Sequence, residues 1–68
     1  MSVARVTEIK ASSPKSFDAA MRDGLDRANK TLKNVKSAWI QDQEILLDGK
    51  GKITEYRVLM KVTFILND

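Results

Sequence analysis

The most regular pattern in the chain is the alternation of side chains between Lys52 and Leu66. Every second residue on one side of this segment is apolar or aromatic: Tyr56, Val58, Met60, Val62, Phe64 and Leu66. Successive side chains of a strand point to opposite faces, so this period of two predicts one long β-strand. So long a strand in a chain of 68 residues needs a cover for its apolar face, and it offers unpaired backbone to neighbours.

Two further strands are expected. The segment Asp48–Gly51 contains two glycines, which reach positive φ at little cost, so it predicts a turn. Lys36–Leu47 before this turn reads as a strand that is antiparallel to the long one. Near the start of the chain, Val3–Lys10 supplies a third strand with a less regular apolar pattern.

The segment Pro14–Lys33 predicts an amphipathic helix. Its apolar residues recur at helical spacing and form one stripe: Phe17, Ala20, Met21, Leu25, Ala28 and Leu32. Ser13 precedes a proline and is the expected N-cap, and Asn34 is the expected stop. Gly24 is a poor helix former, which indicates close packing against a strand, and we expect Leu25 to be buried against the third strand.

Together these elements predict an α+β fold of order β-α-β-β, in which a three-stranded antiparallel sheet partly wraps around one helix. Residues 1–68 form a single domain in this interpretation. One helix covers one face of the sheet and leaves Leu59, Ile65 and Trp39 on the other. A closed symmetric oligomer would bury them. The alternative is a monomer with a few exposed apolar residues, which is normal on any protein surface.

Composition excludes several classes of function. The chain contains neither cysteine nor histidine, so serine–histidine and cysteine–histidine catalysis are excluded. The carboxylates and lysines show no recognisable catalytic spacing, so we do not expect an enzyme. Any bound metal ion would need oxygen ligands, which favours Ca²⁺ or Mg²⁺.

The charges are mixed along the sequence. Twelve Lys and Arg residues against nine Asp and Glu give a net charge of +3, without a basic block that would track phosphates. No apolar run approaches the roughly 20 residues of a membrane span, and Met1–Arg5 lacks a signal-peptide core. We therefore expect a cytoplasmic protein that binds neither nucleic acid nor membrane.

Several short segments occur in a distinctive order. They are Arg5–Ile9, Ser12–Pro14, Phe17–Ala20, Asp26–Ala28, Thr31–Val35, Asp42–Gln43, Tyr56–Val58 and Lys61–Phe64. In this order and at this length the chain resembles the dodecin family over nearly its whole length. The resemblance implies a hollow homododecamer that stores or sequesters a flavin (FMN, riboflavin or FAD) and is not an enzyme.

The resemblance also implies where a flavin binds. In many dodecins a tryptophan early in the second strand stacks on the flavin ring, and a glutamine in the third strand contacts the ring edge. An ungapped alignment places Ser37 at the tryptophan position and Arg57 at the glutamine position, while Asp42 matches the family aspartate. Trp39 lies two residues farther along, on the same strand face as Ser37. The chain thus resembles a branch without the usual stacking tryptophan.

The candidate flavin-binding residues are therefore Trp39, Asp42 and Arg57. Trp39 could instead fill a subunit interface, and Arg57 could instead form an intersubunit ion pair with a carboxylate such as Glu55 or Asp42.

A cation site is the alternative to a flavin site. Asp42, Glu44 and Asp48, repeated around a symmetry axis, would gather enough oxygen ligands for Ca²⁺ or Mg²⁺. The simpler role of these residues is a solvated rim. The sequence thus predicts a flavin-sequestering cage or, alternatively, a flavin-free cage that is purely structural or stabilised by ions.

Overall fold

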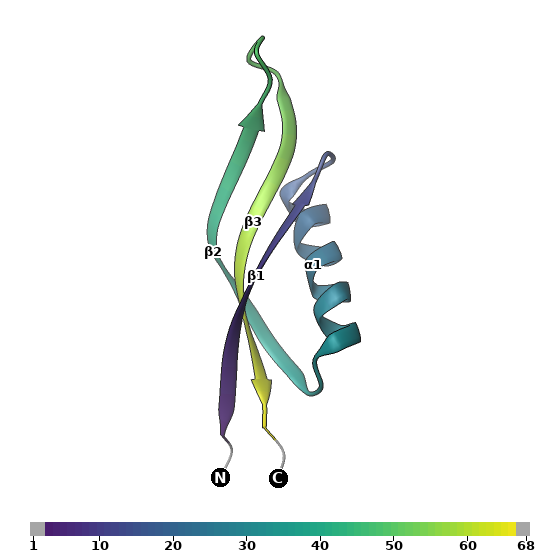
Figure 1. Ribbon diagram of the computed structural model, residues 1–68, viewed down its shortest axis with the longest axis vertical. Helices are drawn as coiled ribbons and strands as arrows, with labels where there is room; N and C mark the ends of the chain where they lie inside the picture. Colours follow the sequence, from purple (N-terminus) through teal and green to yellow (C-terminus); the bar gives the residue numbers. More distant parts are fainter. Residues whose placement is uncertain (1–2, 67–68) are drawn as a thin grey trace.

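A computed structural model describes residues 3–66 of the chain. The elements follow the expected β-α-β-β order, and the fold is α+β (Figure 1): β1 (Ala4–Ser13), α1 (Phe17–Thr31), β2 (Val35–Leu47) and β3 (Ile53–Ile65). The long hairpin of β2 and β3 extends well beyond α1 in this view. Among the described residues, no helix has both the length and the apolar content to cross a membrane.

The three strands form one antiparallel sheet in the order β1-β3-β2. β3 is the central strand, because β1 pairs with it on one side and β2 on the other. The expectation that the third strand offers unpaired backbone was therefore wrong. The free edges belong to β1 and β2, an arrangement that the alternation within β3 could not reveal.

The start of the helix differs from the expectation. Ser13 is the last residue of β1, where it pairs with Tyr56, and its Oγ accepts a hydrogen bond from the Lys15 N–H at 3.0 Å. Ser16 is the N-cap instead, since its Oγ accepts from the Ala19 N–H at 3.0 Å. Ser13 is not the cap because pairing with β3 continues β1 as far as this residue, so the helix starts only after Ser16. β1 therefore continues beyond Lys10.

The end of the helix is close to the expected position. α1 ends at Thr31, and the backbone N–H of Leu32 donates to the Ala28 carbonyl at 2.8 Å. Asn34 adopts a left-handed conformation with φ of 62° in the connection to β2. Asparagine tolerates this conformation better than most residues, so Asn34 suits the turn into β2, while the helix itself ends before the extended Leu32.

The core is built on the closest approach of α1 to the sheet. Ala20, Gly24 and Ala28 are the buried helix residues, while the larger Phe17, Met21 and Leu25 are half-buried and pack against the same core. A Cβ atom added to Gly24 would lie 2.7 Å from the Met60 Cε and 3.0 Å from the Ala11 Cβ. This confirms close packing at Gly24. Leu25 packs against the core that includes Val58 and Met60 of β3, as expected, but it is half-buried and not fully buried.

The face of β3 that was expected to be apolar is the one that packs against the helix. Its buried residues are Val58, Met60 and Val62. Tyr56 is half-buried and contacts Phe17 edge to face, with ring centroids 5.2 Å apart. The alternation in the sequence therefore placed the core on the correct side of the strand.

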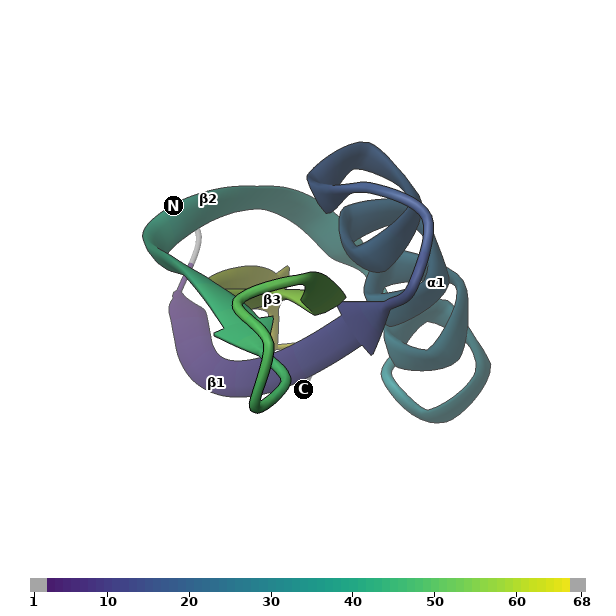
Figure 2. The same cartoon turned by 90° about the horizontal axis from the view of Figure 1, so that it is seen from above.

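The helix covers only part of the sheet. α1 packs mainly against β1 and β3, and Figure 2 shows it to one side of the strongly twisted strands. Large apolar side chains therefore remain exposed on β2 and on the hairpin: Trp39, Ile40, Ile45, Leu47 and Ile53. The molecule is elongated, 52 × 19 × 14 Å, and its radius of gyration is 14.1 Å. A compact chain of this length would have a radius of gyration of about 11 Å.

Gly24→Leu should destabilise the protein, because the new side chain cannot fit between α1, Ala11 and Met60. Overpacking of this kind costs about 1–3 kcal/mol. Thermal unfolding followed by circular dichroism measures the loss. Asn29→Leu is the matched control, since it adds leucine at an exposed position of the same helix. Equal melting temperatures for the two variants would contradict the close approach at Gly24.

Candidate functional site

The sheet has one side that α1 does not face. Strand partners in an antiparallel pair share a side, so the register identifies the residues on it. We call this side the outer face. Its residues are Ala4, Val6, Glu8, Lys10 and Ser12 of β1, Ser37, Trp39, Asp42, Glu44, Leu46 and Leu47 of β2, and Ile53, Glu55, Arg57, Leu59, Lys61, Thr63 and Ile65 of β3.

All three candidate flavin-binding residues lie on the outer face. Trp39 pairs with Lys61, Asp42 with Leu59, and Arg57 with Glu44. Trp39 is 48% exposed, so one of its ring surfaces is available to a ligand or a second chain. Sequence analysis expected Trp39 on this side of the sheet, and it assigned no side to Asp42.

A β-bulge makes this arrangement possible. Trp39 and Asp42 are three residues apart, and in a regular strand they would point to opposite faces. The register shifts between Ile40 and Asp42, so Gln41 is the extra residue and the alternation restarts after it. Sequence analysis missed the bulge, because nothing in the local pattern of apolar residues marks Gln41.

A pocket of about 370 Å³ lies on the outer face. It is lined by Lys10, Asp42, Gln43, Glu44, Arg57 and Leu59. The pocket thus brings Asp42 and Arg57 together with Glu44, whereas Trp39 is not part of its lining. Sequence analysis missed Lys10, which comes from β1 and becomes a neighbour only once the strand order is known.

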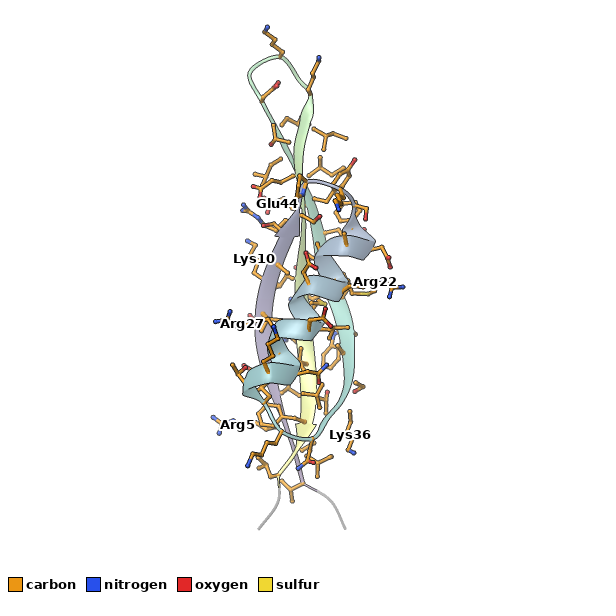
Figure 3. The ribbon with its side chains drawn as sticks, turned by 90° about the vertical axis from the view of Figure 1, so that its right-hand side faces the viewer. Arg5, Lys10, Arg22, Arg27, Lys36 and Glu44 are labelled. Atoms are coloured by element: carbon orange, nitrogen blue, oxygen red, sulfur yellow. The ribbon has the colours of Figure 1, made fainter. Side chains whose placement is uncertain are left out.

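Charged groups in this pocket are linked by ion pairs. Glu44 Oε1 lies 3.8 Å from the Lys10 Nζ and 3.9 Å from an Arg57 nitrogen, and Glu55 Oε2 lies 3.5 Å from the other terminal nitrogen of Arg57. Figure 3 shows Lys10 and Glu44 close together. These distances exceed the roughly 2.7–2.9 Å of tight charge-assisted hydrogen bonds. Within one chain Arg57 thus pairs loosely with Glu55 and Glu44, and a ligand could displace either carboxylate.

Asp48 has a different role in the chain. Its Oδ1 accepts hydrogen bonds from the backbone N–H groups of Lys50, at 2.7 Å, and Lys52, at 3.0 Å, so it shapes the hairpin turn. No three acidic side chains between residues 3 and 66 lie close enough to hold a metal ion within one chain. The cation site formed by Asp42, Glu44 and Asp48 from several copies stays a prediction.

A second groove, of about 550 Å³, lies between α1 and β1. Its floor includes Ile9, Gly24 and Ala28, and Arg27 and Asp23 lie among its polar lining. Although this groove is larger, it contains none of the candidate residues. The outer-face pocket is therefore the better candidate site, because several charged groups converge on it.

Comparisons with known proteins point in one direction. The family model described as Dodecin matches residues 3–67. The calcium dodecin of Mycobacterium tuberculosis is 34% identical over 64 residues, covering 94% of this chain and 89% of the relative. The solved dodecin of Streptomyces davaonensis superposes with a TM-score of 0.92 at 36% identity and covers 98% of this chain and 97% of its own. The solved calcium-chelating antigen, calcium dodecin, of M. tuberculosis superposes with a TM-score of 0.83 at 29% identity, covering 96% of this chain and 91% of its own.

Proposed function

Because this chain belongs to the dodecin family, whose members are non-enzymatic binding proteins, we propose that it forms a hollow homododecamer that stores or sequesters a flavin. The flavin binds at the outer face of the sheet. The observation that carries this proposal is the placement of Trp39, Asp42 and Arg57 on one uncovered face, despite the odd spacing of Trp39 and Asp42.

Surface area supports the assembly. One chain exposes 5146 Å², whereas a compact monomer of its mass would expose roughly 4,300 Å². The excess of roughly 800 Å² is what one partner contributes to a standard protein interface. The buried core is also small, with Met60 as its largest fully buried side chain. A subunit of this kind gains stability mainly by covering its remaining apolar surface with other copies.

The chemistry of the outer face suits a flat, polar-edged ligand. Trp39 offers a ring surface, and aromatic stacking adds about 0.5–1.5 kcal/mol beyond area burial. Arg57 supplies N–H donors, and Asp42 supplies carboxylate acceptors for the ring edge or its side chain. Such binding shields the flavin from solvent and quenches its photochemistry without any covalent step.

Two residues that differ from the family pattern should weaken flavin binding in the usual pose. Ser37, at the position of the family's stacking tryptophan, has no aromatic surface. Arg57, at the glutamine position, cannot accept hydrogen bonds as an amide can. Each loss removes roughly 1 kcal/mol, so affinity falls about ten- to a hundredfold below that of tryptophan-bearing dodecins.

A flavin-free, ion-stabilised cage is the second candidate, and two observations favour it. The relative that is 34% identical is a calcium dodecin. Asp42 makes no ion pair with any of the described residues, so its carboxylate remains available to a cation. Copies of Asp42 and Glu44 that meet at a symmetry axis would supply oxygen ligands for Ca²⁺ or Mg²⁺.

The assembly is tested by native mass spectrometry and sedimentation at micromolar concentration. We expect a closed oligomer of twelve chains with little monomer, because a separate chain leaves too much apolar surface exposed. A population that is mainly monomeric would contradict the proposal.

Flavin binding is tested by fluorescence titration of riboflavin and FMN with the parent, Trp39→Ala and Ser37→Trp. We expect weak parental binding that Trp39→Ala removes, since Trp39 is the remaining stacking surface. Ser37→Trp should strengthen binding about fivefold, because it restores a stacking contact of roughly 1 kcal/mol. Tight parental binding that survives Trp39→Ala would show that the site lies elsewhere.

Cation binding is tested by melting the protein with Ca²⁺ and with a chelator. If the second candidate is correct, Ca²⁺ at a hundredfold excess over its Kd should stabilise the cage by about 2.7 kcal/mol. Asp42→Asn should abolish this gain. Asp26→Asn is the matched control, because it removes the same charge from an exposed position on α1. Equal melting temperatures with and without Ca²⁺ would eliminate this candidate.

A further inference from the structure

The outer face differs in charge from the rest of the molecule. Its cations are Lys10, Arg57 and Lys61, and its anions are Glu8, Asp42, Glu44 and Glu55. This face therefore carries a net charge of −1, although the whole chain carries +3. A ligand that reaches the outer face meets an acidic surface on a basic protein.

Each cation of the outer face already has a carboxylate partner. Lys61 Nζ lies 3.7 Å from Glu8 Oε1, and Lys10 Nζ lies 3.8 Å from Glu44 Oε1. Arg57 contacts carboxylate oxygens of both Glu44 and Glu55. A phosphate group that bound to any of these cations would have to compete with the carboxylate already paired with that cation.

The pocket itself is short of free positive charge. Two cations and two anions line it, and Glu55 adds a third carboxylate next to Arg57. The two cations are thus outnumbered in and beside the cavity. Symmetric copies would repeat this excess of negative charge at every site.

Resting on the proposed function, we infer that the outer face takes an unphosphorylated flavin, riboflavin, in preference to FMN or FAD. The terminal phosphate of FMN carries close to two negative charges at neutral pH, and it meets no unpartnered cation in the pocket. The hydroxyl groups of the ribityl chain are uncharged and can donate hydrogen bonds to the carboxylates of Asp42 and Glu44. The same carboxylates thus accept riboflavin and repel a phosphate.

The expected preference is moderate, since the outer face is open to solvent. Repulsion across about 8–10 Å of screened, partly aqueous surface changes affinity by about three- to tenfold. Salt should reduce it, because the Debye length falls from about 10 Å at 0.1 M to about 3 Å at 1 M.

The experiment compares riboflavin and FMN by fluorescence titration of the assembled protein at about 0.05 M and about 0.5 M salt. The variants are Glu44→Gln, Glu8→Gln and the control Asp26→Asn. Glu44→Gln releases Lys10 and one contact of Arg57, and Glu8→Gln releases Lys61. Asp26→Asn removes the same charge from an exposed position on α1.

We expect riboflavin to bind about three- to tenfold more tightly than FMN at low salt, with a smaller difference at high salt. Glu44→Gln and Glu8→Gln should each improve FMN binding at low salt and narrow the difference, while Asp26→Asn should leave it unchanged. If either variant fails to assemble, the comparison of riboflavin with FMN on the parent protein still tests the preference.

Two outcomes would overturn the inference in distinguishable ways. FMN that binds as tightly as riboflavin, or more tightly, removes the preference but leaves flavin sequestration intact. Binding of neither flavin, at either salt concentration, refutes the proposed flavin site itself and the preference with it.

Discussion

The contact between α1 and the strands at Gly24 is the constraint on which the rest of this small fold depends. A hydrogen in place of a side chain lets the helix lie against Ala11 of β1 and Met60 of β3. Ala20 and Ala28, one turn to either side, are also buried. Since a single helix is centred on β1 and β3, it leaves β2 and the outer face uncovered. This uncovered surface is the reason for proposing that several copies of the chain assemble.

β3 contributes to the core on one face of the sheet and to the candidate site on the other. Val58, Met60 and Val62 form the core with the helix. Arg57 and Lys61, which alternate with them, carry charge on the opposite face. Since core and site use neighbouring residues of one central strand, the backbone that supports the site is held by the packing on the other side.

Much of the fold followed from local patterns in the sequence, and the errors have physical causes. The period of two in β3 and the apolar stripe of α1 are local properties, and both predicted the correct elements. The N-cap was expected at Ser13 but is Ser16. Pairing with Tyr56 extends β1 as far as Ser13, so the helix begins later than expected. That pairing joins residues far apart in the sequence, so no local sequence pattern predicts it.

The candidate site shows the same limit. The family resemblance suggested Asp42 and Arg57 separately, and the structure brings both to one pocket. Lys10 joins them only because β1 lies beside β3, and its ion pair with Glu44 reaches across the central strand. Asp48 was grouped with Asp42 and Glu44, yet its carboxylate is used by the backbone of the turn.

The bulge at Gln41 means that the outer face of β2 depends on a local break in the strand pairing and not on an even spacing of its residues. With one residue fewer between Ile40 and Asp42, the two halves of the strand would fall into a single alternation, and Trp39 and Asp42 would stay on the same side of the sheet. If the strand instead kept Gln41 and lost the bulge, the residues on one side of this point would change face, and Trp39 and Asp42 would be separated. A one-codon deletion of Gln41 could thus remove the irregularity from β2 while leaving both side chains on the outer face.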